Sequence, residues 1–189
     1  MSTLLWLFAV VAILTLLLVF AGIAIYNRLV ALKVSSQNAW SDIDVQLKRR
    51  HDLVPNLVET VKGYAGHERE TLASVTHARA RAVDAKDASP AERAGAEGLL
   101  SQALRGLMVS VEAYPQLQAS GNFADLQQSL NQIESAIQNA RRYYNAVVRD
   151  LNTAVHQFPS NLVAGLFHFG SREFFELDEG EREAPEVRF

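Results

Sequence analysis

"FADLQQSLNQIESAIQNARRYYNAVVRDLNTAVHQF", residues 123–158, carries the strongest periodic signal in the sequence. Its apolar positions alternate in steps of three and four, a period of 3.5 that is typical of a long helix with one contact seam. Asn122 is a suitable N-cap and Pro159 is a stop signal, so the pattern predicts a helix over 122–158. The seam consists of Phe123, Leu126, Leu130, Ile133, Ile137, Ala140, Tyr144, Val147, Leu151, Ala154 and Phe158.

A helix of this length extends for about 55 Å and needs partners along its whole seam. Other helices of the same chain are one source of partners, and helices of neighbouring subunits are another. We expect packing within the chain, as a bundle, and leave packing between subunits open.

The rest of the body is divided by proline, glycine and serine into further helical segments, with no β pattern of consequence. Predicted helices run from the N-terminal side to about residue 62, over 67–86, and from 90 to about 114. Ser89, Pro90 and Glu92 have the spacing of a capping box at the start of the last of these. We predict a loop over "PQLQASGN", residues 115–122, and an all-α fold.

The N-terminal stretch predicts a membrane-spanning helix. Between Leu4 and Ile25 only Thr15 and Gly22 are not hydrophobic, and the stretch is long enough to cross a bilayer core. A cleaved signal peptide is the competing interpretation, but the first three residues carry no Lys or Arg and the apolar run is too long for one. We therefore expect a single-pass anchor over residues 1–26.

The charges that flank the span predict its orientation. Arg28 and Lys33 follow it, and no acidic residue appears before Asp42. Positive flanks remain on the cytoplasmic side, so we expect the N-terminus outside and the C-terminal body in the cytoplasm.

"KRRHDLVPNLVETVKGY", residues 48–64, continues a helical pattern through Pro55. A proline inside a helix removes a backbone donor, whereas in the first turn it costs little. Asp52 is a suitable N-cap that would place Pro55 in a first turn, so we favour a joint or sharp kink near residues 50–53; a continuous helix with a mild kink is the alternative. Gly63 and Gly66 predict a further bend, which makes Asp52, Pro55, Gly63 and Gly66 the candidate hinge residues.

The segment after residue 158 is apolar and then acidic. "FPSNLVAGLFHFG", residues 158–170, is too short to span a bilayer, so it either caps the core of the bundle or contacts lipid or another subunit. Capping is the expected role, and the candidate residues for an oligomer or lipid contact are Leu162, Val163, Leu166, Phe167 and Phe169. Residues 173–189 carry seven acidic residues against two arginines and are expected to be solvated or to dock a partner.

The sequence offers little support for an enzyme, a cofactor site or a nucleic-acid partner. It has no cysteine, no glycine-rich phosphate loop and no HExxH motif. Glu59, His67, Glu70 and His77 are the only arrangement similar to a helical metal site, and the order of His67 and Glu70 is the reverse of the known motif. The net charge of −3 disfavours nucleic acid. We expect no catalytic, cofactor or metal residues, although sequence does not exclude a triad formed around Ser89 or Ser101 by folding.

Two stretches resemble the LemA family of bacterial membrane proteins: "YNRLVALKVSSQNAWSDIDVQLKRRHDLVPNLVETVKGYAGHE" (26–68) and "ARRYYNAVVRDLNTAVHQFPSNLVAGLF" (140–167). The most specific part is "RRHDLVPNLVETVKGYAGHE", residues 49–68. The resemblance implies a single N-terminal membrane helix followed by an antiparallel helical bundle, with no established catalytic activity. Relatives associated with magnetosome membranes imply a role in organising membranes.

These observations predict three parts: an anchor (1–26), a helical bundle with coiled-coil-like packing (27–158) and an apolar segment with an acidic tail (159–189). The first functional hypothesis is a homo-oligomeric scaffold of the bacterial inner membrane, with the lipid bilayer as its partner. The second is a monomeric, membrane-tethered adaptor whose bundle and acidic tail dock a membrane protease or signalling protein.

Overall fold

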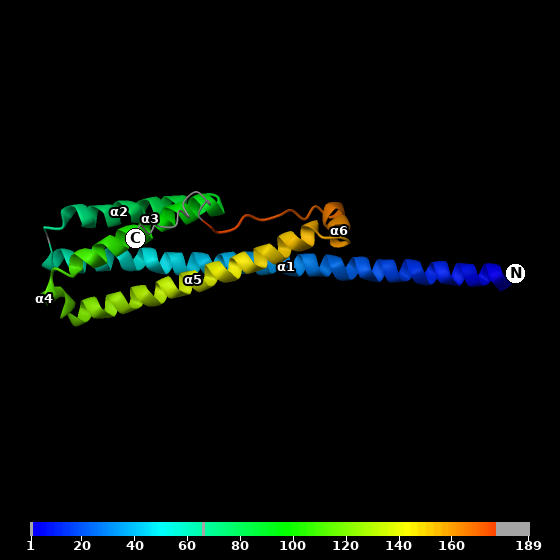
Figure 1. Ribbon diagram of the computed structural model, residues 1–189, viewed down its shortest axis with the longest axis horizontal. Helices are drawn as coiled ribbons and strands as arrows, with labels where there is room; N and C mark the ends of the chain where they lie inside the picture. The colour runs from blue at the N-terminus through cyan, green and yellow to red at the C-terminus, as the bar shows by residue number, and fades with distance from the viewer. Residues whose placement is uncertain (1, 66, 177–189) are drawn as a thin grey trace, which may run out of the picture. The chain divides into compact units, whose positions relative to one another are not determined.

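A computed structural model describes residues 2–65 and 67–176. These residues form only helices and connections, so the predicted all-α fold is confirmed (Figure 1). The helices are α1 (Ser2–Tyr64), α2 (Arg69–Asp84), η1 (Ala85–Asp87), α3 (Pro90–Val111), α4 (Pro115–Gln118), α5 (Gly121–His156) and α6 (Ser160–Leu166).

The chain forms two compact units. The first unit comprises Met1–Ala39 and Ala146–Arg172, and the second comprises Trp40–Asn145 and Glu173–Phe189. Helices α1 and α5 each contribute residues to both units.

The N-terminal part of α1 has the length and composition of a membrane span. Among the described residues, α1 is the only helix that qualifies, and none of its apolar window is buried against them. Side chains such as Trp6, Leu7 and Phe8 are about two-thirds exposed or more. By length and composition, this part of α1 could cross a bilayer.

The preferred joint at residues 50–53 is wrong, because α1 continues through Pro55 without a break. Asp52 is an exposed residue in the middle of the helix and starts no new helix. Proline cannot donate to the carbonyl four residues before it, which here belongs to His51. That carbonyl instead accepts a hydrogen bond from Arg79 Nε on α2 at 2.7 Å, so the missing donor is replaced from another helix.

The bend predicted at the end of this helix lies where the chain turns into α2. Helix α1 ends at Tyr64, directly after the exposed Gly63, and α2 begins at Arg69. Gly66 lies outside the described residues, as do residues 177–189, which include most of the predicted acidic tail.

Helix α3 starts with the predicted capping box. Ser89 Oγ accepts from the Glu92 backbone N–H, and Glu92 Oε2 accepts from the Ser89 backbone N–H at 3.1 Å. The predicted loop at 115–122 instead contains the short helix α4, which begins at a proline and buries Leu117. A proline suits the first position of a helix, and a single apolar residue there is enough to pin one turn against the core.

Helix α5 has the predicted apolar seam, and the seam packs within the chain. Seven of its eleven residues are buried: Phe123, Leu130, Ile137, Tyr144, Val147, Leu151 and Ala154. Phe158 lies beyond the end of α5 and is 73% exposed, so the seam ends one step earlier than predicted.

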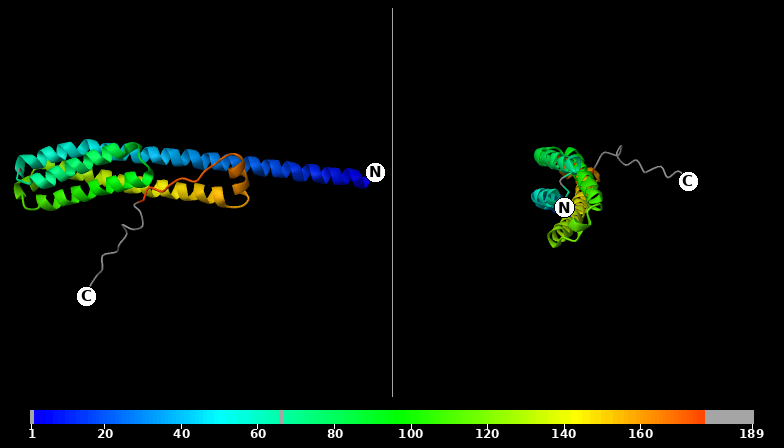
Figure 2. Two further views of the ribbon diagram at one scale, coloured as in Figure 1. Left: turned by 90° about the horizontal axis from the view of Figure 1, so that it is seen from above. Right: turned by 90° about the vertical axis from the view of Figure 1, so that its left-hand side faces the viewer.

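In the second unit, segments of α1, α2, α3 and α5 run side by side around one core, which Figure 2 shows end-on. The core contains residues from each of these helices and from α4, and its members include Val54, Leu57, Val61, Val75, Leu104, Leu107, Leu117 and Phe123. An antiparallel bundle with one continuous apolar core is the predicted packing.

We predict that Arg79 and Pro55 are energetically coupled. Arg79→Ala should lower the free energy of unfolding by about 1–3 kcal/mol, because the His51 carbonyl loses its donor. In a Pro55→Ala background, residue 55 donates to that carbonyl, so the cost of Arg79→Ala should fall below about 1 kcal/mol. Chemical unfolding in mild detergent, followed by circular dichroism, measures both.

The matched control is Arg69→Ala, which removes an exposed arginine of the same helix. An equal cost of Arg79→Ala in the two backgrounds would contradict this account of how α1 passes through its proline.

Candidate functional site

In the first unit, α6 folds back against α1 directly after the membrane span. Ala164 is buried against Leu29 of α1 and Ala154 of α5. Partly buried residues complete this small cluster: Ile25, Leu32, Val155, Val163 and Phe169. The cluster fixes one face of α6 at the point where the span ends.

Aromatic rings of α1 and of the segment after α6 also pack together where the apolar part of α1 ends. The Tyr26 ring centroid lies 4.7 Å from that of Phe167 and 5.7 Å from that of Phe169. Lys33 Nζ lies 5.8 Å from the centre of the Phe169 ring, within the range of a cation–π contact. Tyrosine and lysine are the residue types that favour the headgroup region of a bilayer.

The five residues predicted to contact lipid or another subunit divide into two sets. Val163 and Phe169 are partly buried and pack against the small cluster of Leu29, Ala154 and Ala164, so capping of the bundle core stays a prediction. Leu162, Leu166 and Phe167 are 64%, 73% and 53% exposed. These three form the apolar face of α6, a name that we keep below, and their contact with lipid or a subunit stays a prediction.

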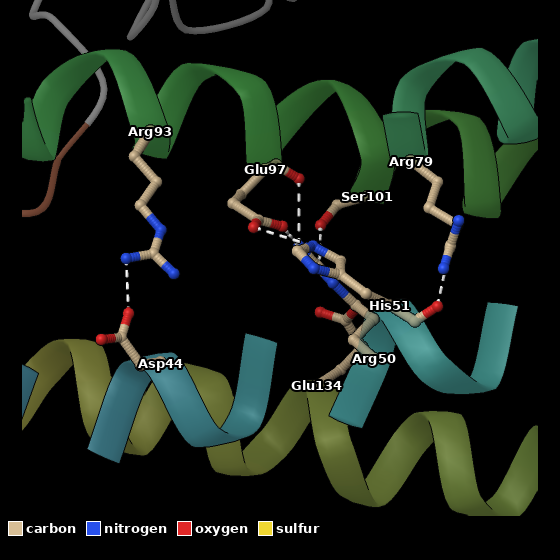
Figure 3. A network of polar contacts seen from close by, with 8 residues as sticks. All are labelled: Asp44, Arg50, His51, Arg79, Arg93, Glu97, Ser101 and Glu134. Carbon is tan, nitrogen blue, oxygen red and sulfur yellow. Dashed lines mark hydrogen bonds and ion pairs between the residues drawn. The ribbon is translucent and has the colours of Figure 1, made fainter. Parts of the chain in front are cut away.

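In the second unit, Arg50 is a buried charge that joins three helices (Figure 3). Its guanidinium forms an ion pair with Glu97 of α3 and another with Glu134 of α5, the latter at 2.7 Å. It also donates to Ser101 Oγ at 2.8 Å. Charge-assisted bonds at its two Nη atoms offset much of the cost of burying the guanidinium, while its Nε has no hydrogen-bond partner among the described residues.

His51 completes the network on the next position of α1. Its Nε2 lies 3.0 Å from Glu97 Oε1. Burial tends to raise the pKa of Glu97, but the bond from His51 and the charges of Arg50 and His51 outweigh it and hold the pKa below its ordinary value. The carboxylate is therefore stabilised in its charged form.

A second buried arginine ties α3 to α1. Arg93 is 3% exposed, and its Nη1 lies 2.5 Å from Asp44 Oδ1. Its guanidinium also lies 5.3 Å from the centre of the Trp40 ring. Figure 3 shows the contact between Arg93 and Asp44 beside the network of Arg50.

The C-terminal segment is bound along α5 by asparagine side chains. In the first unit, Asn152 donates to the Arg172 carbonyl at 2.9 Å and accepts from the Arg172 N–H at 2.8 Å. In the second unit, Asn145 forms the same pair of bonds with the carbonyl and N–H of Phe175, at 3.3 and 2.9 Å. Each amide thus replaces the partners that a neighbouring β-strand would offer.

A groove of about 1120 Å³ lies next to this segment in the second unit. Helix α3 and helix α5 contribute most of its walls, and Leu47, Leu104, Leu130 and Ile137 give it an apolar lining together with Phe175. Arg50, Glu97 and Glu134 line the same groove. Their charges are paired with one another, so they give structural support and offer no unpaired nucleophile or base.

The residues considered for catalysis or metal binding are not brought together. Glu59, His67, Glu70 and His77 are all exposed. In the described part of the chain, no three acidic, histidine or cysteine side chains gather as metal ligands. Ser89 caps α3, and Ser101 accepts from Arg50.

Sequence reasoning did not find the partners of the polar residues near Pro55. Glu97 and Glu134 lie 47 and 84 residues from Arg50, and no local pattern connects them. The asparagines left a visible signal, because Asn131, Gln138, Asn145 and Asn152 follow one another every seven residues on α5.

The comparisons with known proteins identify the family of this chain. A family model described as the LemA family matches residues 39–189. Magnetosome protein MamQ 2 of Paramagnetospirillum magneticum is 26% identical over 175 residues, covering 80% of this chain and 64% of its own length. Protein LemA of Metamycoplasma hominis is 30% identical over 161 residues, covering 82% of this chain and 71% of its own length. The chain therefore spans less than two-thirds of the magnetosome relative.

We predict that breaking the buried ion pair costs more than replacing it. Arg50→Met leaves Glu97 buried with no arginine partner and should lower the free energy of unfolding by about 3–5 kcal/mol. The double variant Arg50→Met, Glu97→Met buries no such charge and should be markedly more stable than the single variant. Equal unfolding midpoints in urea for the two variants would argue against a buried ionic contact.

The lowered pKa of Glu97 predicts that the stability of the fold decreases at acidic pH. A carboxyl whose pKa is lower in the folded chain stabilises the fold above its unfolded value, near 4.5, and this contribution disappears as the pH falls through the folded value. The melting temperature of the wild type should therefore fall more steeply between pH 6 and pH 3.5 than that of Glu97→Gln. Parallel curves would show that Glu97 does not contribute in this way.

Proposed function

The chain belongs to the LemA family, and from this premise we propose that it is a non-enzymatic, membrane-anchored bundle that self-associates to organise or shape the bacterial inner membrane. The similarity to magnetosome proteins supports a membrane role. Since the chain spans 64% of the length of those relatives, the self-association rests on the features of this chain alone.

The observation that carries the proposal is a second apolar surface beside the membrane span. The apolar window of the span is not buried against any described residue, and Leu162 and Leu166 of the apolar face of α6 remain 64% and 73% exposed. Phe167 belongs to that face and packs against Tyr26, one residue after the apolar run ends. The two apolar surfaces are therefore adjacent, and one of them could cross a bilayer by length and composition.

The position of α6 favours the boundary between acyl chains and headgroups as its environment. Lys33 follows Tyr26 by seven residues, about 10 Å along the helix, which places a positive charge at the depth of lipid phosphates. Short amphipathic helices bury an apolar face to this depth without spanning the bilayer. In this arrangement α6 lies in the membrane surface next to the span.

Self-association follows from where apolar surface is still exposed. The seam of α5 is used within the chain, so it offers little to a second copy. The span, the apolar face of α6 and Phe158 retain exposed apolar side chains. We propose that copies meet through these elements in the plane of the membrane, with the N-terminus outside and the bundle in the cytoplasm, as Arg28 and Lys33 favour.

A monomeric adaptor that docks a membrane protease or signalling protein is the second candidate function. The groove between α3 and α5 favours it, because the groove offers apolar and charged lining in the second unit.

We predict that charges on the apolar face of α6 abolish assembly. Full-length protein in mild detergent should form a discrete oligomer by light scattering corrected for detergent, and should change the shape of reconstituted vesicles. Leu162→Glu combined with Leu166→Glu should lose both properties, because carboxylates are costly to place at the acyl boundary.

The matched control is Thr153→Glu combined with Gln157→Glu, which adds the same charges at exposed positions on or just after α5 in the same unit. A monomeric wild type would overturn self-assembly and leave the tethered adaptor. An oligomer unaffected by either pair would remove α6 from the contact.

A further inference from the structure

The C-terminal segment shows how α5 binds an extended chain. Asn152 and Asn145 each form two hydrogen bonds with the backbone of a single residue, Arg172 and Phe175 respectively. The asparagines are seven residues apart in sequence, and their partners are three apart. Such bonds recognise an extended backbone and not a particular side chain.

The same spacing continues along α5 past the last bound residue. Gln138 precedes Asn145 by seven residues, and Asn131 precedes Gln138 by seven. Seven helical residues rise by about 10.5 Å and three extended residues cover about 10 Å, so amides at this interval match every third residue of an extended chain. Neither Gln138 nor Asn131 has a side-chain hydrogen bond to any other described residue.

Both amides line the groove that Phe175 enters. The Phe175 side chain is buried, and its ring centroid lies 5.7 Å from that of Trp40. Arg141 lies above the same ring, 5.2 Å from its centre. The bound segment therefore arrives at the groove in the direction that leads to Gln138 and then to Asn131.

The rim of the groove favours an acidic occupant. Arg81, Arg105 and Arg141 line it, and none of them forms an ion pair with a carboxylate among residues 2–65 and 67–176. Burial and the charge of Arg50 lower the pKa of Arg141, and the charges of Glu176 and Glu134 act in the opposite direction. Asp84 and Glu92 also line the groove, but Glu92 is engaged in the cap of α3.

We propose that this groove binds the chain's own acidic C-terminus, residues 177–189, as an extended peptide, with Gln138 and Asn131 pairing with the backbone of residues 178 and 181. The sequence continues into these residues directly from Glu176, and they contain five acidic residues against two arginines. The two further pairings, at residues 178 and 181, extend only six residues beyond Phe175, so the tail is long enough to reach both amides. The site is independent of self-association in the membrane.

Engineered disulfides test the proposal in the full-length protein, because the natural sequence has no cysteine. Gln102→Cys places a thiol at an exposed position on the α3 wall of the groove, and Glu179→Cys places one in the tail. The control pairs Glu179→Cys with Ser135→Cys, an exposed position of α5 outside the groove. Oxidation is followed by non-reducing gel and intact mass, after circular dichroism has established equal helicity.

We expect an intramolecular disulfide that forms at least ten times faster in the groove pair than in the control pair. Adding Gln138→Leu and Asn131→Leu should slow it several-fold, since the backbone partners are gone. Equal rates for the groove and control pairs would overturn the proposal. Disulfide-linked dimers specific to the groove pair would also overturn it, because the occupant would then be the tail of a second copy.

Discussion

One turn of α1 holds the helices of the second unit together. The side chain of Arg50 binds α3 and α5, and the backbone carbonyl of the next residue, His51, binds Arg79 of α2. That carbonyl is available because Pro55, four residues later, has no N–H to donate. The proline therefore creates the acceptor through which α2 is attached to α1.

A buried ionic contact of this kind contributes to register as well as to stability. The apolar core around it is rich in alanine, valine and leucine, which tolerate small shifts between helices. Arg50 tolerates no such shift, since its two carboxylates come from different helices and its guanidinium is 1% exposed. We infer that the ion pairs select one arrangement of helices that apolar packing alone would leave less defined.

The sequence predicted the features that depend on neighbouring residues. The span, the seam of α5 and the capping box at Ser89 all follow from periodicity and spacing within one segment. The joint at Asp52 was wrong because the partner that stabilises the proline, Arg79, lies on another helix. The partners of Arg50 were missed for the same reason. The inner and outer faces of α6 also depend on the packed fold, because the contact of Ala164 with Leu29 sets which side of α6 is buried. Local patterns indicate which residues form helices, whereas polar pairing between helices depends on the packed fold.

In the proposed function, the first unit relates the bundle to lipid. Its apolar cluster fixes α6 beside the end of the span, and the exposed side chains of Leu162, Leu166 and Phe167 then need an apolar environment. A membrane protein held at two adjacent places, by a spanning helix and by a helix in the surface, is restricted in tilt and rotation. The proposed self-association depends on such a restriction, through which several copies would impose a common geometry on a bilayer.

The depth of α6 in a bilayer tests this account most directly. A nitroxide on Leu166→Cys, in vesicles, should be accessible to oxygen and protected from a water-soluble nickel complex, as lipid-buried labels are. A label on Asp150→Cys, an exposed position of α5 in the same unit, should show the reverse. Equal access of the nickel complex to both labels would show that α6 lies in water and would contradict the two-point attachment.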